Sequence, residues 1–264
     1  ADDRVPNDPV SAVVAVADRI DTLVGCFGIG LVPSGSADPF ALRRAALGII
    51  RIALEGPIDI DLNTLVTRAQ EAYSGDADLR PADEVQAALD DFFRARMRAM
   101  LKGAYGGDVV DACLGAWEGT SIRDLRTRIE AVSEVRIAPE FEALAVAFKR
   151  AFNITKESPR GSVDPALLED GAERELADRF TTVRDQIRGA TEERRYADAL
   201  KLVAQELGAP IDRFFDEVFV MVDDSQVRDN RLRLLGEIAD TVNGIAHLHQ
   251  LGTRLQDRDP SLSV

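Results

Sequence analysis

The stretch ADRIDTLVGCFGIGLVPSGSADPFALRRAALGIIR, residues 17–51, decides how the first part of the chain folds. Its apolar pattern predicts a helix, a glycine-rich turn and a second helix. Asp38 can accept hydrogen bonds from the free backbone N–H groups at the start of the second helix, and Pro39 suits the first helical position. Phe40 would then begin the apolar face of that helix. The stretch therefore predicts two helices joined by a tight turn.

Working outward, apolar residues at spacings of three and four predict a first helix that starts after Asp8-Pro9 and runs to Phe27. The same spacing predicts later helices at about residues 62–73, 82–102, 108–117, 121–133, 139–152, 165–188, 191–207, 210–222 and 225–251. The segment VFVMV, residues 218–222, is rich in β-formers, but it follows a helical pattern and is interpreted as a buried helix end. No alternating apolar–polar run has the length of a strand, so we expect an all-α bundle of about nine to eleven helices.

Composition sets limits on the function. The 264 residues allow one large or two small domains, and 45% of them are apolar, which is enough for a core. The formal net charge is −14, from 46 acidic and 32 basic residues, which argues against a general polyanion binder but allows a local basic patch. Cys26 and Cys113 lie in apolar helical runs and are predicted to be reduced core residues. No apolar run reaches the roughly 18 residues of a membrane span.

Several longer segments resemble one protein family. They are ADRIDTLVG and DPFALRRAALGIIRI near the start, AVSEVRI (131–137) and AFKRAFNITK (147–156) in the middle, and RRYADAL (194–200), PIDRFFDEVFVMVDD (210–224) and RDNRLRLL (228–235) near the end. On these motifs the chain resembles the β subunit of the bacterial tetrameric glycyl-tRNA synthetase. The resemblance covers roughly residues 10–251.

The resemblance implies the tail of an HD-like helical domain at residues 1–56, linker helices at 57–81 and a DALR-type anticodon-binding-like domain at 82–264. It implies that tRNA-Gly and a glycyl-tRNA synthetase α subunit are partners in an α2β2 assembly in the cytoplasm. Glycine activation with ATP and Mg would belong to the α subunit, and no cofactor is implied for this chain. Because the sequence starts without Met, inside what the family has as a domain, we expect a fragment of a longer subunit.

The sequence shows no catalytic or metal site of its own. The GIG of residues 28–30 follows a helix and lacks the lysine of a phosphate loop, so it is interpreted as a turn. Asp18 resembles the last metal ligand of HD-type phosphohydrolases, but the upstream histidines are missing, which favours a vestigial structural role. His247 and His249 would point about 200° apart on a regular helix, so they are not expected to bind one metal ion together. We interpret both as exposed or interfacial residues.

Helical phase sorts the basic residues into candidate tRNA contacts. Arg94, Arg98 and Lys102 share about a quarter of their helix surface, and Lys149, Asn153 and Lys156 share another face with Arg150 adjacent. Arg228 and Arg233 are predicted to point outward. The alternative for all of them is an ordinary solvated face. Arg43, Arg44 and Arg51 could contact tRNA or a partner subunit, or hold the turn glycines in place.

Two arginines have a structural prediction instead. Arg96 falls on an apolar helix face, where a cation needs a partner, so it is predicted to form an ion pair. Arg231 lies among leucines and is predicted to pair with Asp216 or Asp223. Among the aromatic residues we expect Trp117 and Tyr105 to be exposed for base stacking. The core-like spacing of Phe92, Phe93, Phe214, Phe215 and Phe219 predicts that these five are mostly buried.

Two other functions stay open. The acidic charge supports a purely structural module that docks the partner subunit while RNA binds elsewhere on the longer chain. A vestigial HD-type phosphohydrolase would instead retain a metal at Asp18.

Overall fold

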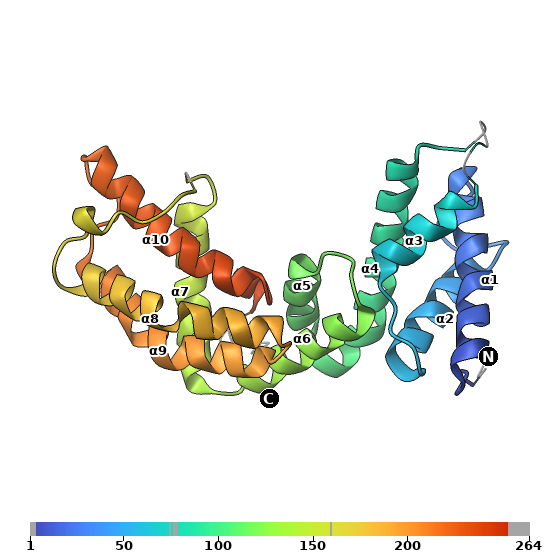
Figure 1. Cartoon of the computed structure of the whole chain (residues 1–264), viewed down its shortest axis with the longest axis horizontal. Coiled ribbons are helices and arrows are strands. Elements are labelled where there is room, and N and C mark those ends of the chain that lie inside the picture. The colour runs from blue at the N-terminus through green and yellow to red at the C-terminus, as the bar shows by residue number, and fades with distance from the viewer. Residues whose placement is uncertain (1–3, 74, 76–78, 159, 253–264) are drawn as a thin grey trace, which may run out of the picture. The chain divides into compact units, whose positions relative to one another are not determined.

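The computed structural model describes residues 4–73, 75, 79–158 and 160–252. The described chain is helical, with two isolated β-bridges and no strand. Its elements are α1 (Pro9–Gly28), α2 (Leu42–Glu55), α3 (Leu62–Glu71), α4 (Ala82–Tyr105), α5 (Gly107–Ala116), α6 (Ile122–Val135), α7 (Pro139–Thr155), the short 3-10 helix η1 (Pro165–Leu167), α8 (Ala172–Glu192), α9 (Tyr196–Glu217), α10 (Ser225–Asn243) and a second 3-10 helix, η2 (Leu248–Gln250) (Figure 1). The prediction of an all-α fold is confirmed. No described helix has the length and apolarity needed to cross a membrane.

The chain divides into two compact units. Unit 1 takes in the chain up to Ala104 together with Glu118–Arg126, and unit 2 takes in Tyr105–Trp117 together with the chain from Thr127 onward. The boundaries expected from the resemblance, at residues 56 and 81, stay a prediction.

In unit 1, helix α1 packs against α2 and α3 (Figure 1). Asp8 caps α1, because its carboxylate accepts a hydrogen bond of 2.8 Å from the Ser11 backbone N–H. The rings of Phe27 and Phe92 meet edge to face at 5.0 Å, which joins α1 to α4. Only the second half of the apolar stripe that predicted the first helix, Ile20, Leu23, Val24 and Phe27, is buried in this core, whereas Val10, Val13 and Val14 are exposed.

The second helix begins later than predicted. Asp38 does cap it, since its carboxylate accepts hydrogen bonds of 2.8 and 3.0 Å from the backbone N–H groups of Leu42 and Arg43. The helix starts only at Leu42, because Ala41 has a left-handed backbone with φ of 54°. Phe40 consequently lies in the turn and is 51% exposed, so the prediction that it begins the apolar face is wrong.

The C-terminal end of α2 is closed by arginine side chains from a distant segment of unit 1. Arg123 donates to the carbonyl of Ala53 at 2.8 Å and to that of Gly56, and Arg126 donates to the carbonyl of Leu54 at 3.0 Å. The last carbonyls of a helix have no intrahelical donor, and the helix dipole favours a cation there. These two arginines are therefore structural.

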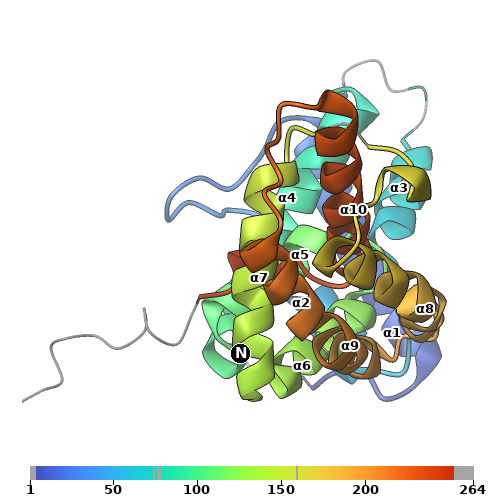
Figure 2. The ribbon, with the colours of Figure 1, turned by 90° about the vertical axis from the view of Figure 1, so that its left-hand side faces the viewer.

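In unit 2, helices α8 and α9 lie side by side, and α7 packs against α9 and α10 (Figure 2). Helix α9 is continuous through Pro210, so the prediction of two helices separated near residue 209 is wrong. Proline removes one hydrogen bond of a helix interior. Burial of Leu207, Ile211 and Phe214 on either side of it stabilises the uninterrupted helix.

Other helix boundaries also differ from the prediction. Helix α8 begins at Ala172 rather than near residue 165, where the short η1 lies instead. Helix α9 stops at Glu217, and in the following segment Val220 is buried whereas Phe219 and Met221 are 74% and 53% exposed. The segment at 218–222 is thus extended and half-exposed rather than a buried helix end. Helix α10 stops at Asn243, where Gly244 follows, so the predicted helix does not reach residue 251.

Candidate nucleic-acid interface

The first candidate surface is one face of α7 in unit 2. Lys149, Asn153 and Lys156 are exposed, and their spacing places them on one side of the helix and its C-cap. Neither lysine forms an ion pair with another residue that the structure describes. Two cations and an amide on one face offer donors to phosphate oxygens and an amide for a base edge.

Arg150, next on the same helix, points to a different neighbour. Its guanidinium carbon lies 4.3 Å from the ring centre of Phe215 on α9, a cation–π contact. Burial and the nearby Asp216 carboxylate raise the pKa of Asp212, and the charge of Arg150 opposes this rise. Arg150 is therefore exposed but already held by α9, unlike the two lysines.

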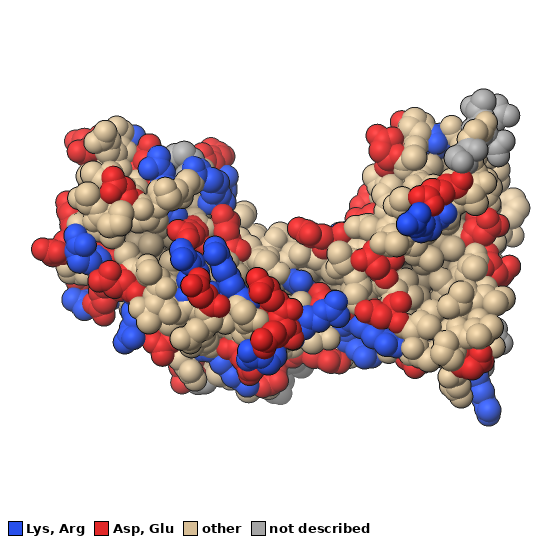
Figure 3. All heavy atoms as spheres, in the orientation of Figure 1, with Lys and Arg blue, Asp and Glu red and all other residues tan. Residues whose placement is uncertain are grey.

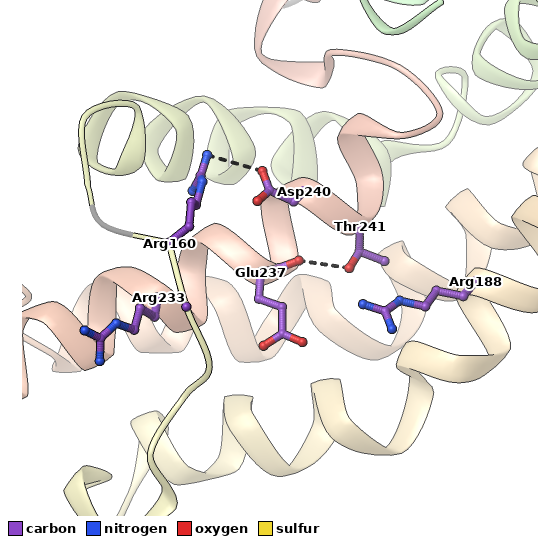
Figure 4. A pocket seen from close by; sticks show the side chains of 7 residues that line it. Arg160, Arg188, Arg233, Glu237, Asp240 and Thr241 are labelled. Atoms are coloured by element: carbon purple, nitrogen blue, oxygen red, sulfur yellow. Dashed lines mark hydrogen bonds and ion pairs between the residues drawn. The ribbon is translucent and has the colours of Figure 1, made fainter. Parts of the chain in front are cut away.

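The second candidate surface is a pocket of about 400 Å³ in unit 2, shown in Figure 4. Arg160 and Gly161 of the α7–α8 connection line it, with Arg188 of α8 and, from α10, Arg233, Glu237, Asp240 and Thr241. Arg160 points toward Asp240, 3.3 Å away, in an ion pair that Figure 4 marks. The carboxylate of Glu237 pairs with Arg184 at 3.1 Å. Both acids of the pocket are thus partly neutralised within the protein.

The other two arginines of this pocket have no acidic partner among the described residues. Arg188 is exposed, and neither it nor Arg233 forms an ion pair there. Arg233 is half-buried rather than pointing outward, and its Nε is buried without a hydrogen-bond acceptor. A buried donor without an acceptor is costly, so Arg233 is held at the pocket with part of its hydrogen-bonding capacity unused.

Sequence reasoning missed Arg160 and Arg188. Arg160 lies in a polar connection, where no periodicity indicates a direction. Arg188 could have been found, because it follows Arg184 by one helical turn on α8, and residues so spaced share a face. What brings Arg160, Arg188 and Arg233 together is the packing of three segments, which is not visible in local spacing.

Arg228 makes local contacts with the backbone and with an acid next to it in the chain. It is half-buried, donates to the Val222 carbonyl at 3.1 Å and lies 3.8 Å from the Asp229 carboxylate. These contacts hold the chain at the entry to α10, and the side chain is half-buried rather than pointing fully outward.

The α4 group belongs to unit 1. Arg94 lies 2.6 Å from the carboxylate of Asp90, one helical turn earlier, so this cation is partly neutralised. Arg98 and Lys102 are exposed on the same face. Of the predicted α4 group, Arg98 and Lys102 are thus exposed and Arg94 is half-buried.

Arg96 does not form the predicted ion pair. Its guanidinium lies over the ring of Phe92 and donates to the Phe92 carbonyl, while its Nε is buried without a partner. Desolvation lowers the pKa of Arg96, repulsion from Arg43 lowers it further, and Asp38 raises it. The arginine is accommodated by an aromatic ring because no acidic side chain lies within ion-pair distance in the described structure.

Arg231 is in an ion pair, but its partners differ from those expected. Its guanidinium contacts Glu173 at 2.9 Å and Glu169 at 2.8 Å, and it donates to the Phe219 carbonyl at 3.0 Å. Asp216 and Asp223 form no ion pair with any described residue. The acids come from far away in the sequence, Glu173 from the first turn of α8 and Glu169 from the segment just before it, because α8 packs on α10.

The aromatic residues are distributed differently from the prediction. Trp117 is only 2% exposed, and the hydroxyl of half-buried Tyr105 donates to Glu130 at 3.2 Å, so Trp117 is not an exposed stacker. Phe92, Phe93 and Phe214 are core residues as expected. Phe219, expected in the core, is 74% exposed and is the aromatic ring most open to a base.

The two histidines lie beyond the end of α10. Their rings stack with centres 5.4 Å apart, and His249 also stacks on Phe152 at 3.6 Å, so the expectation of opposite helical directions is wrong. Burial lowers the pKa of both histidines, and His247 and Lys149 lower that of His249 further. No three His, Cys, Asp or Glu side chains converge as a metal site in the parts of the chain that the structure describes.

Figure 3 shows acidic and basic side chains interspersed over the face in view. Because a basic residue beside an acid is partly neutralised, the number of basic residues on a surface says little about its ability to bind an anion. The cations that make no ion pair with a described residue are the better guide to a candidate surface.

Comparisons with known proteins cover most of the chain. A family model described as glycyl-tRNA synthetase beta subunit matches residues 1–115, and one described as DALR anticodon binding domain matches residues 144–252. The glycine–tRNA ligase beta subunit of Geobacter metallireducens is 43% identical over 243 residues, which are 92% of this chain and 35% of that protein. That of Desulforudis audaxviator is 43% identical over 249 residues, 93% of this chain and 36% of that protein. The chain thus spans about a third of the length of these relatives.

Proposed function

The chain belongs to the family of glycyl-tRNA synthetase β subunits, and from this premise we propose that it is the part of such a subunit that binds tRNA-Gly. The observation that carries the proposal lies in unit 2. The residues that match the anticodon-binding family model include Lys149, Lys156, Arg188 and Arg233, cations that form no ion pair with a described residue. The net charge of −14 disfavours non-specific binding to polyanions, and a few such cations on this acidic chain favour binding to a specific one.

The mechanism is positional. The α7 lysines and the arginines of the pocket would hold backbone phosphates, Asn153 would reach a base edge, and Phe219 would stack on an unpaired base. Holding the tRNA in one orientation brings its 3′ end to an active site elsewhere in the enzyme. Orientation of this kind accelerates a reaction without a catalytic group in the chain that provides it.

The partners follow from the same premise. Glycine activation with ATP and Mg would take place on an α subunit, and the assembly would be an α2β2 tetramer in the cytoplasm. The relatives carry the name of glycine–tRNA ligase beta subunits, which supports an α-subunit partner.

The test is binding of the 264-residue chain to tRNA-Gly and to a non-cognate tRNA while the salt concentration is varied. Each phosphate contact contributes roughly 0.7–0.9 to the slope of log affinity against log salt. We expect steep salt dependence, tighter binding of tRNA-Gly, and a smaller slope for Lys149→Ala/Lys156→Ala and for Arg188→Ala/Arg233→Ala.

Matched controls come from the same unit. Lys201→Ala removes an exposed lysine that pairs with Glu134 at 2.6 Å, and Arg179→Ala removes an exposed α8 arginine that pairs with Glu206 at 3.4 Å. These cations are already neutralised, so their loss should leave the slope unchanged. A folded chain that binds neither tRNA at low salt would overturn the proposal.

One observation favours a second role, subunit assembly. Val10, Val13 and Val14 on α1 are 73%, 55% and 62% exposed, and side chains at this spacing form an apolar row on one side of the helix. Such a row suits contact with protein rather than with RNA. We propose it as the alternative if the chain binds an α subunit but no tRNA.

A further inference from the structure

Unit 1 contains a second basic pocket, distinct from the surfaces above. It has a volume of about 590 Å³ and is lined by five arginines and one acid, namely Arg4, Arg19, Arg43, Arg44, Arg51 and Asp38. A chain with 46 acidic and 32 basic residues would not bring five arginines and a single acid together by composition alone. The pocket lies where α1, α2 and the segments that precede them meet.

Arg19 is fixed in the pocket by a glycine. Its guanidinium donates to the Ala15 carbonyl at 2.6 Å, which anchors it to α1. Its Nε lies only 2.6 Å from the place where a Cβ of Gly48 would be, so the absent side chain of Gly48 lets Arg19 lie across α2. The half-buried guanidinium is therefore oriented by the protein before any ligand arrives.

Three more arginines are contributed by α2. Arg43 donates to the Gly35 carbonyl at 2.7 Å. Because this acceptor is a neutral carbonyl, the bond does not neutralise the positive charge of Arg43. Arg44 and Arg51 share a face of the helix. Arg51 has only a surface contact of 3.6 Å with Glu55, and exposed Arg44 pairs with no described acid. Surface pairs of this type contribute little, so Arg51 can turn to another anion.

Asp38, the acid of the pocket, is engaged elsewhere. Both of its carboxylate oxygens accept backbone hydrogen bonds at the start of α2. The positive field also extends to Arg96, because repulsion from Arg43 contributes to the lowered pKa of that neighbour. Guanidinium groups that line one pocket with few counter-charges repel one another, and an anion bound among them is attracted to each.

We propose that this pocket, with five arginines in its lining, is a binding site for phosphate groups. The planar guanidinium presents paired N–H donors that match phosphate oxygens. The phosphates could belong to an RNA strand or to a free diphosphate, which share this chemistry. The inference rests on unit 1 alone and does not depend on the tRNA-binding role proposed for unit 2.

The experiment is a calorimetric titration of the 264-residue chain with inorganic pyrophosphate. Arg44→Ala/Arg51→Ala should weaken binding roughly tenfold or more, since two charge-assisted contacts are lost. Gly48→Ala should weaken it through displacement of Arg19. The variant Arg44→Lys/Arg51→Lys keeps the positive charges but loses the paired N–H donors of the guanidinium groups. It should bind pyrophosphate with intermediate affinity.

Arg68→Ala/Arg80→Ala is the matched control, because these arginines of unit 1 lie outside the pocket, in surface pairs of 3.0 and 3.4 Å. A thermal melt of each variant checks folding. A single-stranded RNA without terminal phosphates then separates the two sources: competition with pyrophosphate identifies a backbone site, and the absence of competition identifies a site for free diphosphate. Pyrophosphate that does not bind, or that binds Arg44→Ala/Arg51→Ala as tightly as the unchanged chain, would overturn the proposal.

Discussion

The guanidinium of Arg231 lies 2.9 Å from the carboxylate of Glu173, and the two side chains are only 3% and 1% exposed. Arg231 comes from α10 and Glu173 from the first turn of α8, where a negative charge also suits the helix dipole. Burying a charge is costly unless an opposite charge compensates it, so Arg231 and Glu173 depend on each other and the pair joins the two helices inside unit 2.

Removing one partner of this pair should destabilise the chain strongly. Arg231→Met leaves Glu173 as a buried, unpaired charge, for which the expected loss is about 3–5 kcal/mol of unfolding free energy. The double variant Arg231→Met/Glu173→Leu removes both charges and should recover most of it. Urea unfolding of the three chains measures this, and a double variant as unstable as the single one would contradict the argument.

Substitutions of Trp117 and Phe219 should affect different properties, the first the stability of the fold and the second the affinity for RNA. Trp117→Ala empties a buried site and should cost about 3–5 kcal/mol of unfolding free energy. Phe219→Ala removes an exposed ring, so stability should change by less than about 0.5 kcal/mol, whereas affinity for tRNA-Gly should fall by roughly 1–3 kcal/mol if a base stacks there. Thermal melts and tRNA titrations of both variants check this. Unchanged tRNA affinity in Phe219→Ala would remove the ring from the proposed interface.

Stability should fall as the solution is acidified through the histidine range. The folded state lowers the pKa of His247 and His249, chiefly by burial, so the unfolded chain binds more protons once the pH drops below about 6.5. The contribution of the two neutral histidines to the unfolding free energy is therefore complete above that pH. It is lost as the pH falls toward their lowered pKa values in the folded chain. Melting temperatures at about pH 7.5 and about pH 5.5 measure the loss.

The matched variant for this effect is His249→Phe, which keeps a ring stacked on Phe152 but cannot take up a proton. Its melting temperature should depend less on pH than that of the unchanged chain. An equal pH dependence in the two chains would assign the loss to His247 or to carboxylates instead.

The two thiols should differ in reactivity. Burial raises the pKa of the Cys113 thiol to about 12, so almost none of it is thiolate near neutral pH. Cys26 is half-buried, and desolvation raises its pKa as well. A chromogenic disulfide reagent should therefore modify Cys26 slowly in the folded chain and Cys113 only after unfolding in guanidinium. Cys26→Ser should abolish the reaction of the folded chain, and a residual native-state reaction in that variant would contradict the burial of Cys113.

The candidate site could be predicted only in part. Helical phase correctly grouped Lys149, Asn153 and Lys156, because residues at those spacings share a face in any regular helix. It could not find that Arg160 and Arg188 join Arg233, nor that Trp117 is covered, since those outcomes depend on which elements pack together.

The sequence by itself determined the all-α fold and many helix starts. Periodicity and capping act within one helical turn, so Asp8, Asp61 and Ser121, whose side chains accept from backbone N–H groups three residues on, could mark where helices begin. Tertiary structure decided whether α9 passes through Pro210 and which acid meets Arg231. That acid lies 58 residues away along the chain, and contacts at such a distance form only when α8 and α10 pack together.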